Sequence, residues 1–499
     1  MFVNKKLSNN IIMALLSQFV VTVCAFIISH KILAVFGSEA NGLLQSVTRF
    51  MSFITLLEGG FGGVIKAAFY KPLHQKDQLQ LCRLFNSTRS IFAKLGFIVL
   101  LYAIVVGVFF KQLSDSSYDQ WTCFGLVLVI SGATIAEYVV GISYDLILQA
   151  DRKVYISASI SIVFYLLRLG VMYLVILLNG SLFTVEVSFL ILMLIRVLVL
   201  RSIARRQYDF TLTKEKQPIE NRWDGMVQHI AYTIHNNVDV ILITLFLSLK
   251  DVSVYSVYSM VVAAVNKVVK AISIGTSATI GKIIASGDKE RLCVASEKYV
   301  FSSAIISGSL FAAVSGIVMP FIGLYTKGVT DADYINVLYA YLIIMAEAVY
   351  CLRIPIKTIV GAAGHYRQTR NGSMIEALIN LILSLILIQI IGVSGILFAT
   401  LIAMIYRTVD LTIYLVKHLL IRKTKIISIL LVNFILVLVT GFETLISKNV
   451  ECHSYLMLFC IGIVFGVANL ALVAGVNTLI FGDIMGIKEK LFGSKRKGV

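Results

Sequence analysis

The sequence predicts an all-α polytopic membrane protein with about fourteen transmembrane helices, and three observations predict it. The 499 residues are 58% hydrophobic and 14% charged, and their mean hydropathy is +0.88, which ordinary soluble domains do not reach. Apolar stretches of about twenty residues, enough to cross a bilayer, recur along the chain. Only four prolines interrupt the chain, so we expect long helices with few breaks.

On the bilayer-length rule we expect membrane helices near residues 9–35, 42–70, 90–110, 121–148, 154–178, 182–204, 224–248, 252–284, 299–325, 333–362, 370–391, 393–416, 425–446 and 454–481. The first stretch follows Lys5 and Lys6, but it is too long for the core of a signal peptide and has no small-residue cleavage site. We therefore interpret it as a membrane helix.

Positive charges gather in every second loop, at residues 71–89, 152–153, 201–222, 289–291, 367–370 and 422–425. The alternate loops carry Asp and Glu and few positive charges. The positive-inside rule therefore predicts that both termini lie in the cytoplasm, and an even number of helices agrees with this because it places both termini on the same side. A net charge of +17 is also found in nucleic-acid-binding proteins, but topology explains these short basic loops better, so no nucleic acid is expected as a partner.

A long polar connector after the sixth segment divides the chain. We expect an N-lobe of six helices at residues 1–204, a cytoplasmic connector at 205–223, a C-lobe of six helices at 224–420, and two additional helices with a basic cytoplasmic tail at 421–499. Residues about 211 positions apart match, which indicates two parallel repeats related by a pseudo-two-fold axis along the membrane normal. The matches are Asp77, Leu81 and Cys82 with Asp288, Leu292 and Cys293; Ala136-Glu137 with Ala346-Glu347; and Arg196 with Arg407.

A narrow stripe of small and polar residues follows one face of the second segment. Its members are Thr48, Ser52, Thr55, Gly59, Gly62 and Lys66, and a similar stripe in the eighth segment runs through Ser256, Ser259, Ala263, Asn266, Lys270, Ser273 and Ser277. Close packing of helices explains such small residues equally well. Lys270 favours a water-filled cavity, because a central lysine costs roughly 2.5–3.5 kcal/mol in hydrocarbon.

Two sets of candidate site residues follow from these patterns. The candidate substrate-binding residues are Arg49, Ser52, Thr55, Lys66, Asn266, Lys267 and Lys270. Charged residues also occur within the apolar segments, among them the carboxylates Glu58, Glu137 and Glu347 and the arginines Arg353 and Arg407. Such residues are either functional or held in ion pairs that fix helix packing, and the sequence leaves both readings open.

The seventh segment carries His235, Asn236, Asn237 and Asp239 in one short run. Carboxylate and amide oxygens suit a hard cation such as sodium. The seven cysteines form no Cys-x-x-Cys pair, and enzyme signatures such as His-Glu-x-x-His are missing. We therefore expect a transporter rather than an enzyme, with no cofactor other than sodium ions or protons as the coupling ion.

Several runs resemble the Wzx-like polysaccharide flippases of the multidrug/oligosaccharidyl-lipid/polysaccharide (MOP) exporter superfamily. They are Lys6-Leu7-Ser8-Asn9, Glu58-Gly59-Gly60-Phe61-Gly62, Ala68-Phe69-Tyr70-Lys71-Pro72-Leu73 and Gln149-Ala150-Asp151-Arg152. The resemblance covers essentially the whole chain. It implies two six-helix lobes around a central cavity, with two appended helices, in the bacterial cytoplasmic (inner) membrane.

The resemblance also implies an activity. Such a protein would move an undecaprenyl-pyrophosphate-linked oligosaccharide from the inner to the outer leaflet by alternating access, for O-antigen, capsule or exopolysaccharide synthesis. A polysaccharide polymerase and glycosyltransferases would be its protein partners. Related lipid-linked precursor flippases carry a sodium site on helices 7, 11 and 12, and here Asp239, Glu376, Asn380 and, more loosely, Thr400 match in placement.

Two other functions remain open at this point. A drug or cation antiporter of the same superfamily would more often have twelve helices, so the two C-terminal segments count against it. A membrane polysaccharide polymerase or ligase usually has a large external loop with catalytic Arg or His, whereas the external loops here are short.

Overall fold

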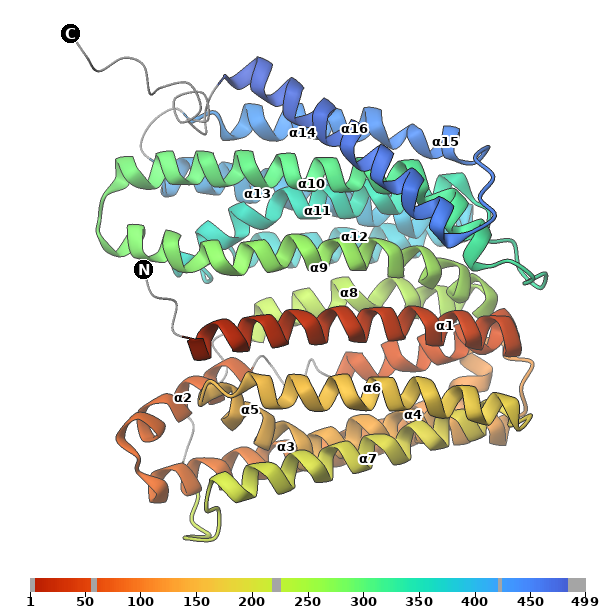
Figure 1. The fold of residues 1–499 in the computed structure, drawn as a ribbon, viewed down its shortest axis with the longest axis vertical. Helices are drawn as coiled ribbons and strands as arrows, with labels where there is room; N and C mark the ends of the chain where they lie inside the picture. Colours follow the sequence, from red (N-terminus) through yellow and green to blue (C-terminus); the bar gives the residue numbers. More distant parts are fainter. Residues whose placement is uncertain (1–4, 55–60, 218–225, 421–423, 483–499) are drawn as a thin grey trace. The chain divides into compact units, whose positions relative to one another are not determined.

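The computed structural model describes residues 5–54, 61–217, 226–420 and 424–482, and these form helices and no strands (Figure 1). The described residues include twelve helices that are long and apolar enough to span a membrane. The first of them consists of two helices joined at Gly37. A further apolar helix is α8, in which only some of the side chains are described. The protein is therefore an all-α, multi-pass membrane protein, and the predicted count of about fourteen spans compares with twelve in the described part of the chain.

The helices group into two compact units, residues 1–253 and 254–499. The first unit contains α1 (Lys5–Phe53), α2 (Phe61–Gln75), α3 (Gln78–Ser114), α4 (Gln120–Ala136), the π-helix η2 (Glu137–Gly141), α5 (Ile142–Ala150), α6 (Val154–Leu177), α7 (Leu182–Gln207), α8 (Met226–Phe246) and the start of α9 (Leu249–Ala285). The second contains the rest of α9, α10 (Lys289–Tyr325), α11 (Val337–Ala362), α12 (Arg370–Ile391), α13 (Val393–His418), α14 (Ile426–Gly441), α15 (Glu443–Ser447) and α16 (Tyr455–Phe481). The sequence-based lobe boundaries stay a prediction.

Helix α1 runs through the boundary that hydropathy placed between the first two segments. Gly37 has φ 85° and ψ 177°, a conformation that is essentially reserved for glycine, and it kinks the helix. The helix continues to Phe53, and helix resumes with α2 at Phe61. Residues 55–60 lie outside the described part of the chain, so the structure does not test whether the predicted stripe is one continuous helix.

The second half of α1 packs closely on α8 and on the start of α9. A Cβ atom at Gly42 would overlap the carbonyl oxygen of Leu249. Asn41 Nδ2 donates to Ser253 Oγ at 2.7 Å, and the hydroxyls of Ser46 and Thr244 hydrogen-bond at 2.7 Å. Small and polar residues therefore join these helices, as is common inside membranes.

The predicted fourth segment is not a regular α-helix. It consists of α4 and α5 joined by the single π-turn Glu137–Gly141, a feature often found at functional sites. The carboxylate of Glu137 lies directly over Gly141, where a Cβ atom would meet it at 2.9 Å. Gly141 therefore leaves room for the Glu137 side chain.

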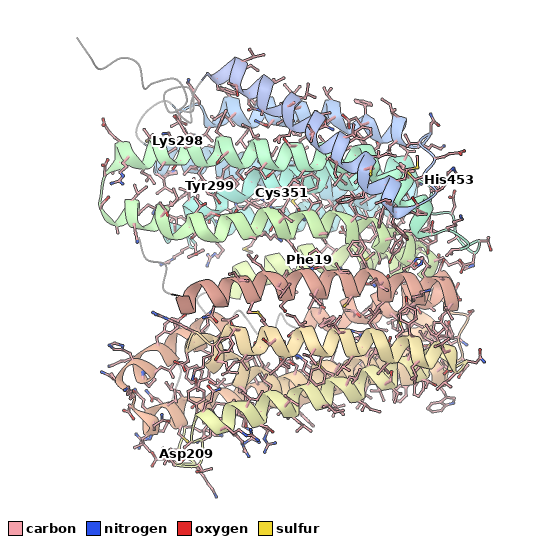
Figure 2. The ribbon with its side chains drawn as sticks, viewed as in Figure 1. Phe19, Asp209, Lys298, Tyr299, Cys351 and His453 are labelled. Atoms are coloured by element: carbon pink, nitrogen blue, oxygen red, sulfur yellow. The ribbon has the colours of Figure 1, made fainter. Side chains whose placement is uncertain are left out.

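Residues 208–217, which follow α7, lie along α3. Asn86 donates to the carbonyl oxygens of Thr213 (2.7 Å) and Glu215 (3.2 Å), and Ser87 donates to that of Gln217 (2.6 Å). Figure 2 shows Asp209, within this segment, at the edge of the structure. Burial and the hydrogen bond to Asp151 raise the pKa of Tyr208 at the start of the segment, so its phenol stays a donor at neutral pH. The described part of the predicted connector is thus fixed to the first unit.

The core of the second unit is built around α10 and α11. In the most apolar stretch of each helix, 61% of the residues of α10 and 72% of those of α11 are buried. Helices α15 and α16 pack on α10: Phe465 of α16 lies against Gly316, and Ser447 Oγ of α15 donates to the Ser315 carbonyl at 3.2 Å. The buried amides of Asn433 and Asn477 pair with each other at 2.8 and 3.1 Å. The outer faces of both units carry exposed apolar side chains that suit lipid chains, among them Leu177, Leu456 and Leu479.

Candidate functional site

In the second unit, polar residues of α9 face polar residues of α11. Asn266 and Lys270 lie one turn apart on α9, and Glu347, Tyr350 and Cys351 lie on the facing side of α11. Asn266 Nδ2 donates to the Glu347 carboxylate, and Cys351 Sγ donates to Asn266 Oδ1 at 2.8 Å. Lys270 Nζ stands 4.9 Å from the centre of the Tyr350 ring. Figure 2 labels Cys351 among the helices of this unit.

The burial of these residues shows which of them can meet a ligand. Asn266 is buried, Lys270 and Glu347 are half-buried, and Lys267 is exposed on a neighbouring face of α9. Among the described residues, Lys270 and Arg353 are cations near enough to Glu347 for their charges to act on its carboxylate, and both approach the Tyr350 ring one turn along α11. The structure therefore brings together the predicted residues Asn266, Lys270 and Glu347, and it places Lys267 apart from them. We call Asn266, Lys270, Glu347 and Tyr350 the α9–α11 cluster.

A second charged cluster joins α11, α12 and α13. Arg353 Nη1 donates to Glu376 at 2.7 Å, and Arg407 Nε lies 3.7 Å from the same carboxylate. Arg407 also pairs with Asp410 and donates to Ser373 Oγ at 2.7 Å. Both arginines are only 4% exposed, and buried charges of this kind require such pairing. Glu376, predicted as an ion-coupling residue, thus lies in ion pairs with two arginines.

The other predicted ion-coupling residues are distributed as follows. Asn380 Nδ2 donates to Thr400 Oγ1 at 2.8 Å, so the structure brings these two residues together in the second unit. Asp239 is buried in the first unit, on α8, and the side chains of His235 and Asn236 lie outside the description. Within the described residues, no group of three or more His, Cys, Asp or Glu side chains is arranged to hold a metal ion.

The remaining predicted residues lie in the first unit. Arg49 on α1 and Lys66 on α2 are half-buried, and Ser52 Oγ donates to the Thr48 carbonyl at 2.8 Å. Thr55 and Glu58 lie outside the described residues. Glu137 pairs with Arg196 of α7 at 2.8 Å, which is the packing role that the sequence left open for it.

Sequence reasoning missed Tyr350, Cys351 and Asp410. The spacing of Glu347, Tyr350 and Cys351 on one helical face was a usable signal, because i, i+3 and i+4 residues share a face. Asp410 could have been found as an i+3 partner of Arg407 in the same way.

No protein-family model matches the sequence, and no curated protein matches it. Several solved structures do match the structure of this chain. A lipid II flippase, MurJ, in an inward closed conformation has a TM-score of 0.70 at 15% identity, over 95% of this chain and 100% of that chain. An inward-facing multidrug resistance MATE transporter of the MOP superfamily has a TM-score of 0.63 at 11% identity, over 79% of this chain and 94% of that chain.

A further match is a MOP superfamily transporter from Pyrococcus furiosus, with a TM-score of 0.54 at 11% identity, over 82% of this chain and 94% of that chain. These identities are low, so the comparisons bear on architecture. The chain therefore has the fold of the MOP-superfamily transporters.

Proposed function

We propose that the protein is a flippase that moves an undecaprenyl-pyrophosphate-linked oligosaccharide from the inner to the outer leaflet of the bacterial cytoplasmic membrane by alternating access. Its product would serve O-antigen, capsule or exopolysaccharide synthesis, alongside glycosyltransferases and a polysaccharide polymerase. This is the activity expected of a Wzx-like member of the superfamily.

The observation that carries the proposal is the extent of the structural match. The match to the lipid II flippase spans 95% of this chain, so it leaves out only about 25 residues, fewer than α14 and α16 together contain. The match to the MATE transporter spans 79% and leaves about a fifth of this chain without a counterpart. A fold shared over its full length with a carrier of a lipid-linked substrate favours that substrate class over a drug or a cation.

The α9–α11 cluster has the chemistry that such a substrate needs. A pyrophosphate is bound by charge-assisted hydrogen bonds in a site of low dielectric constant, which Lys270 and the amide of Asn266 can supply. Arg49, Lys66 and Lys267 are further cations, and Ser52 and Thr55 further hydroxyls, that we assign to the substrate path. Transport of this kind makes and breaks no covalent bond, so it needs no catalytic residue.

We further propose that an ion gradient drives the cycle. Asp239, Glu376, Asn380 and Thr400 are the residues assigned to a sodium ion, and a proton carried by an intramembrane carboxylate is the alternative. The oxygen ligands suit a hard cation. No other cofactor is needed for transport down such a gradient.

The experiment is transport in proteoliposomes with a fluorescent undecaprenyl-pyrophosphate-linked oligosaccharide. Lys270→Ala should lose most of the transport while its amount in the membrane stays at the wild-type level, because the pyrophosphate loses a cation. Lys270→Arg should keep part of the activity if charge dominates. Lys282→Ala, at an exposed position near the end of the same helix, shows what loss of one charge does away from the cluster.

Two results would contradict the proposal. Wild-type protein that exports a cationic dye against a gradient and leaves the lipid-linked glycan in place would support the antiporter instead. Normal transport by Lys270→Ala would remove the α9–α11 cluster from the substrate path.

A further inference from the structure

The Glu347 carboxylate already interacts with the donor groups, those of Asn266 and Lys270, that we assign to the substrate pyrophosphate. It accepts the amide hydrogen of Asn266, and the Lys270 charge acts on it. These donors are an N–H group and an ammonium, which are the donors that phosphate oxygens also accept. A carboxylate and a pyrophosphate cannot both accept the same hydrogen atoms.

In the predicted repeat, the first-unit counterpart of Glu347 has a different partner among the described residues. In the first unit the corresponding acid, Glu137, pairs with Arg196 at 2.8 Å. The counterpart of Arg196 is Arg407, which instead bonds Glu376, Asp410 and Ser373. Glu347 is therefore directed to α9 rather than to the arginine that its position in the repeat would give it.

Glu347 also has a second cation within reach of its charge. Arg353 acts on Glu347 electrostatically, and its guanidinium carbon lies 5.2 Å from the centre of the Tyr350 ring that Lys270 also approaches. A carboxylate displaced from α9 would thus still be near a positive charge. Displacement would not leave an uncompensated buried anion, which is the state that costs most in a membrane.

Resting on the proposed function, we infer that Glu347 is an internal anion that competes with the substrate pyrophosphate for Asn266 and Lys270. Because it is tethered, it competes at a high effective concentration whatever the substrate level. The substrate binds by displacing it toward Arg353. After translocation Glu347 returns to the α9 donors, so the substrate leaves a site whose donors are satisfied at once. Glu347 is a positioning residue that limits affinity and promotes release.

The test is Glu347→Gln, which keeps the shape of the side chain and its acceptor for Asn266 but removes the negative charge. The probe is undecaprenyl pyrophosphate in detergent, with uncharged undecaprenol as the reference lipid. We expect about tenfold tighter binding of the pyrophosphate, the order of one charge-assisted hydrogen bond, and unchanged binding of undecaprenol. Transport in proteoliposomes should become slower, because release is impaired.

The control is Glu443→Gln, since Glu443 is also a carboxylate that accepts from an asparagine amide, Asn469, at 3.1 Å, but it lies on α15. Its affinity for the pyrophosphate should stay at the wild-type value. In Glu347→Gln combined with Lys270→Ala the gain should disappear. Should Glu347→Gln not fold, Glu347→Asp serves instead: its carboxylate is withdrawn by one methylene, so binding should again become tighter.

The outcomes separate the two proposals. Equal or weaker binding of undecaprenyl pyrophosphate by Glu347→Gln or Glu347→Asp, next to normal binding by the wild type, would overturn the competition and leave the proposed function intact. Wild-type protein that binds the pyrophosphate no better than undecaprenol would overturn the proposed function, and this inference with it.

Discussion

Three of the described intramembrane carboxylates lie in settings that differ from one another. Glu137 has one arginine, Glu376 has two, and Glu347 has an amide and a lysine. A carboxylate between two arginines is strongly held, because each charge-assisted bond is about twice as strong as a neutral one. One next to an amide and a half-buried lysine is held less tightly. The residue type alone, Glu in an apolar segment, does not distinguish these settings.

Asp239 provides the residue-scale prediction. If it binds a sodium ion, sodium chloride should raise the melting temperature of the purified wild-type protein, because a ligand that binds only the folded state stabilises it. Asp239→Ala should abolish that rise. The measurement is thermal unfolding in detergent across a sodium titration.

Potassium chloride at equal ionic strength is the control for this experiment, since it screens charges to the same extent. A wild-type melting temperature that does not depend on sodium would remove the sodium site from the account and leave a proton as the coupling ion. A sodium response that survives in Asp239→Ala would place the ion elsewhere.

At the scale of helices, Gly42 provides a prediction about the contact of α1 with α9. Gly42→Ala should destabilise the protein by about 1–3 kcal/mol, because the new methyl group meets the backbone of Leu249, which cannot move aside as a side chain could. Gly63→Ala, on α2, is the matched control: nothing lies within 4 Å of its Cβ position. That substitution should be neutral or stabilising by up to about 1 kcal/mol. Unfolding in detergent measures both.

The same contact tests how the helices are joined. If Gly42→Ala and Gly63→Ala shift the unfolding transition equally, then the close approach at Leu249 does not contribute to stability. In that case the hydrogen bonds of Asn41 with Ser253 and of Ser46 with Thr244 would carry the contact alone.

A succession of long apolar helices could be predicted from the sequence, because bilayer thickness sets a length that apolar stretches must meet. The kink at Gly37 and the π-turn at Glu137 could not, because hydropathy does not record the φ angle of one residue or one inserted residue in a helix. For the candidate site, Asn266 and Lys270 follow from spacing along α9. Whether Glu347 contacts them depends on how α11 is rotated about its own axis, which the sequence does not specify.

For the whole molecule, the charge pattern of the loops predicts the orientation in the membrane. Cysteines introduced at Asp115 and Asp331, both exposed, should react with an impermeant thiol reagent added to intact cells. Cysteines at Lys214 and Lys495 should react only after the cells are opened. Labelling detected by a gel shift checks each position.

Native cysteines that react with the reagent would add background labelling to this experiment. Cys452 lies in the loop before α16, which the same topology places outside, so it should itself be labelled in the unmodified protein. The four substitutions are therefore made together with Cys452→Ser. Labelling of the Lys214 position in intact cells would reverse the orientation and invalidate the assignment of parallel repeats.

The paired amides of Asn433 and Asn477 have a consequence for biosynthesis. Each side-chain amide bonds the other and also a carbonyl of its own helix, Ile429 for one and Val473 for the other. Together they need no group from α1 to α13. Because α14 and α16 follow α10 in the chain, they can enter the bilayer as a hairpin with both amides already satisfied, before they dock on α10. These two helices can thus be inserted as one unit, without waiting for the helices before them to pack.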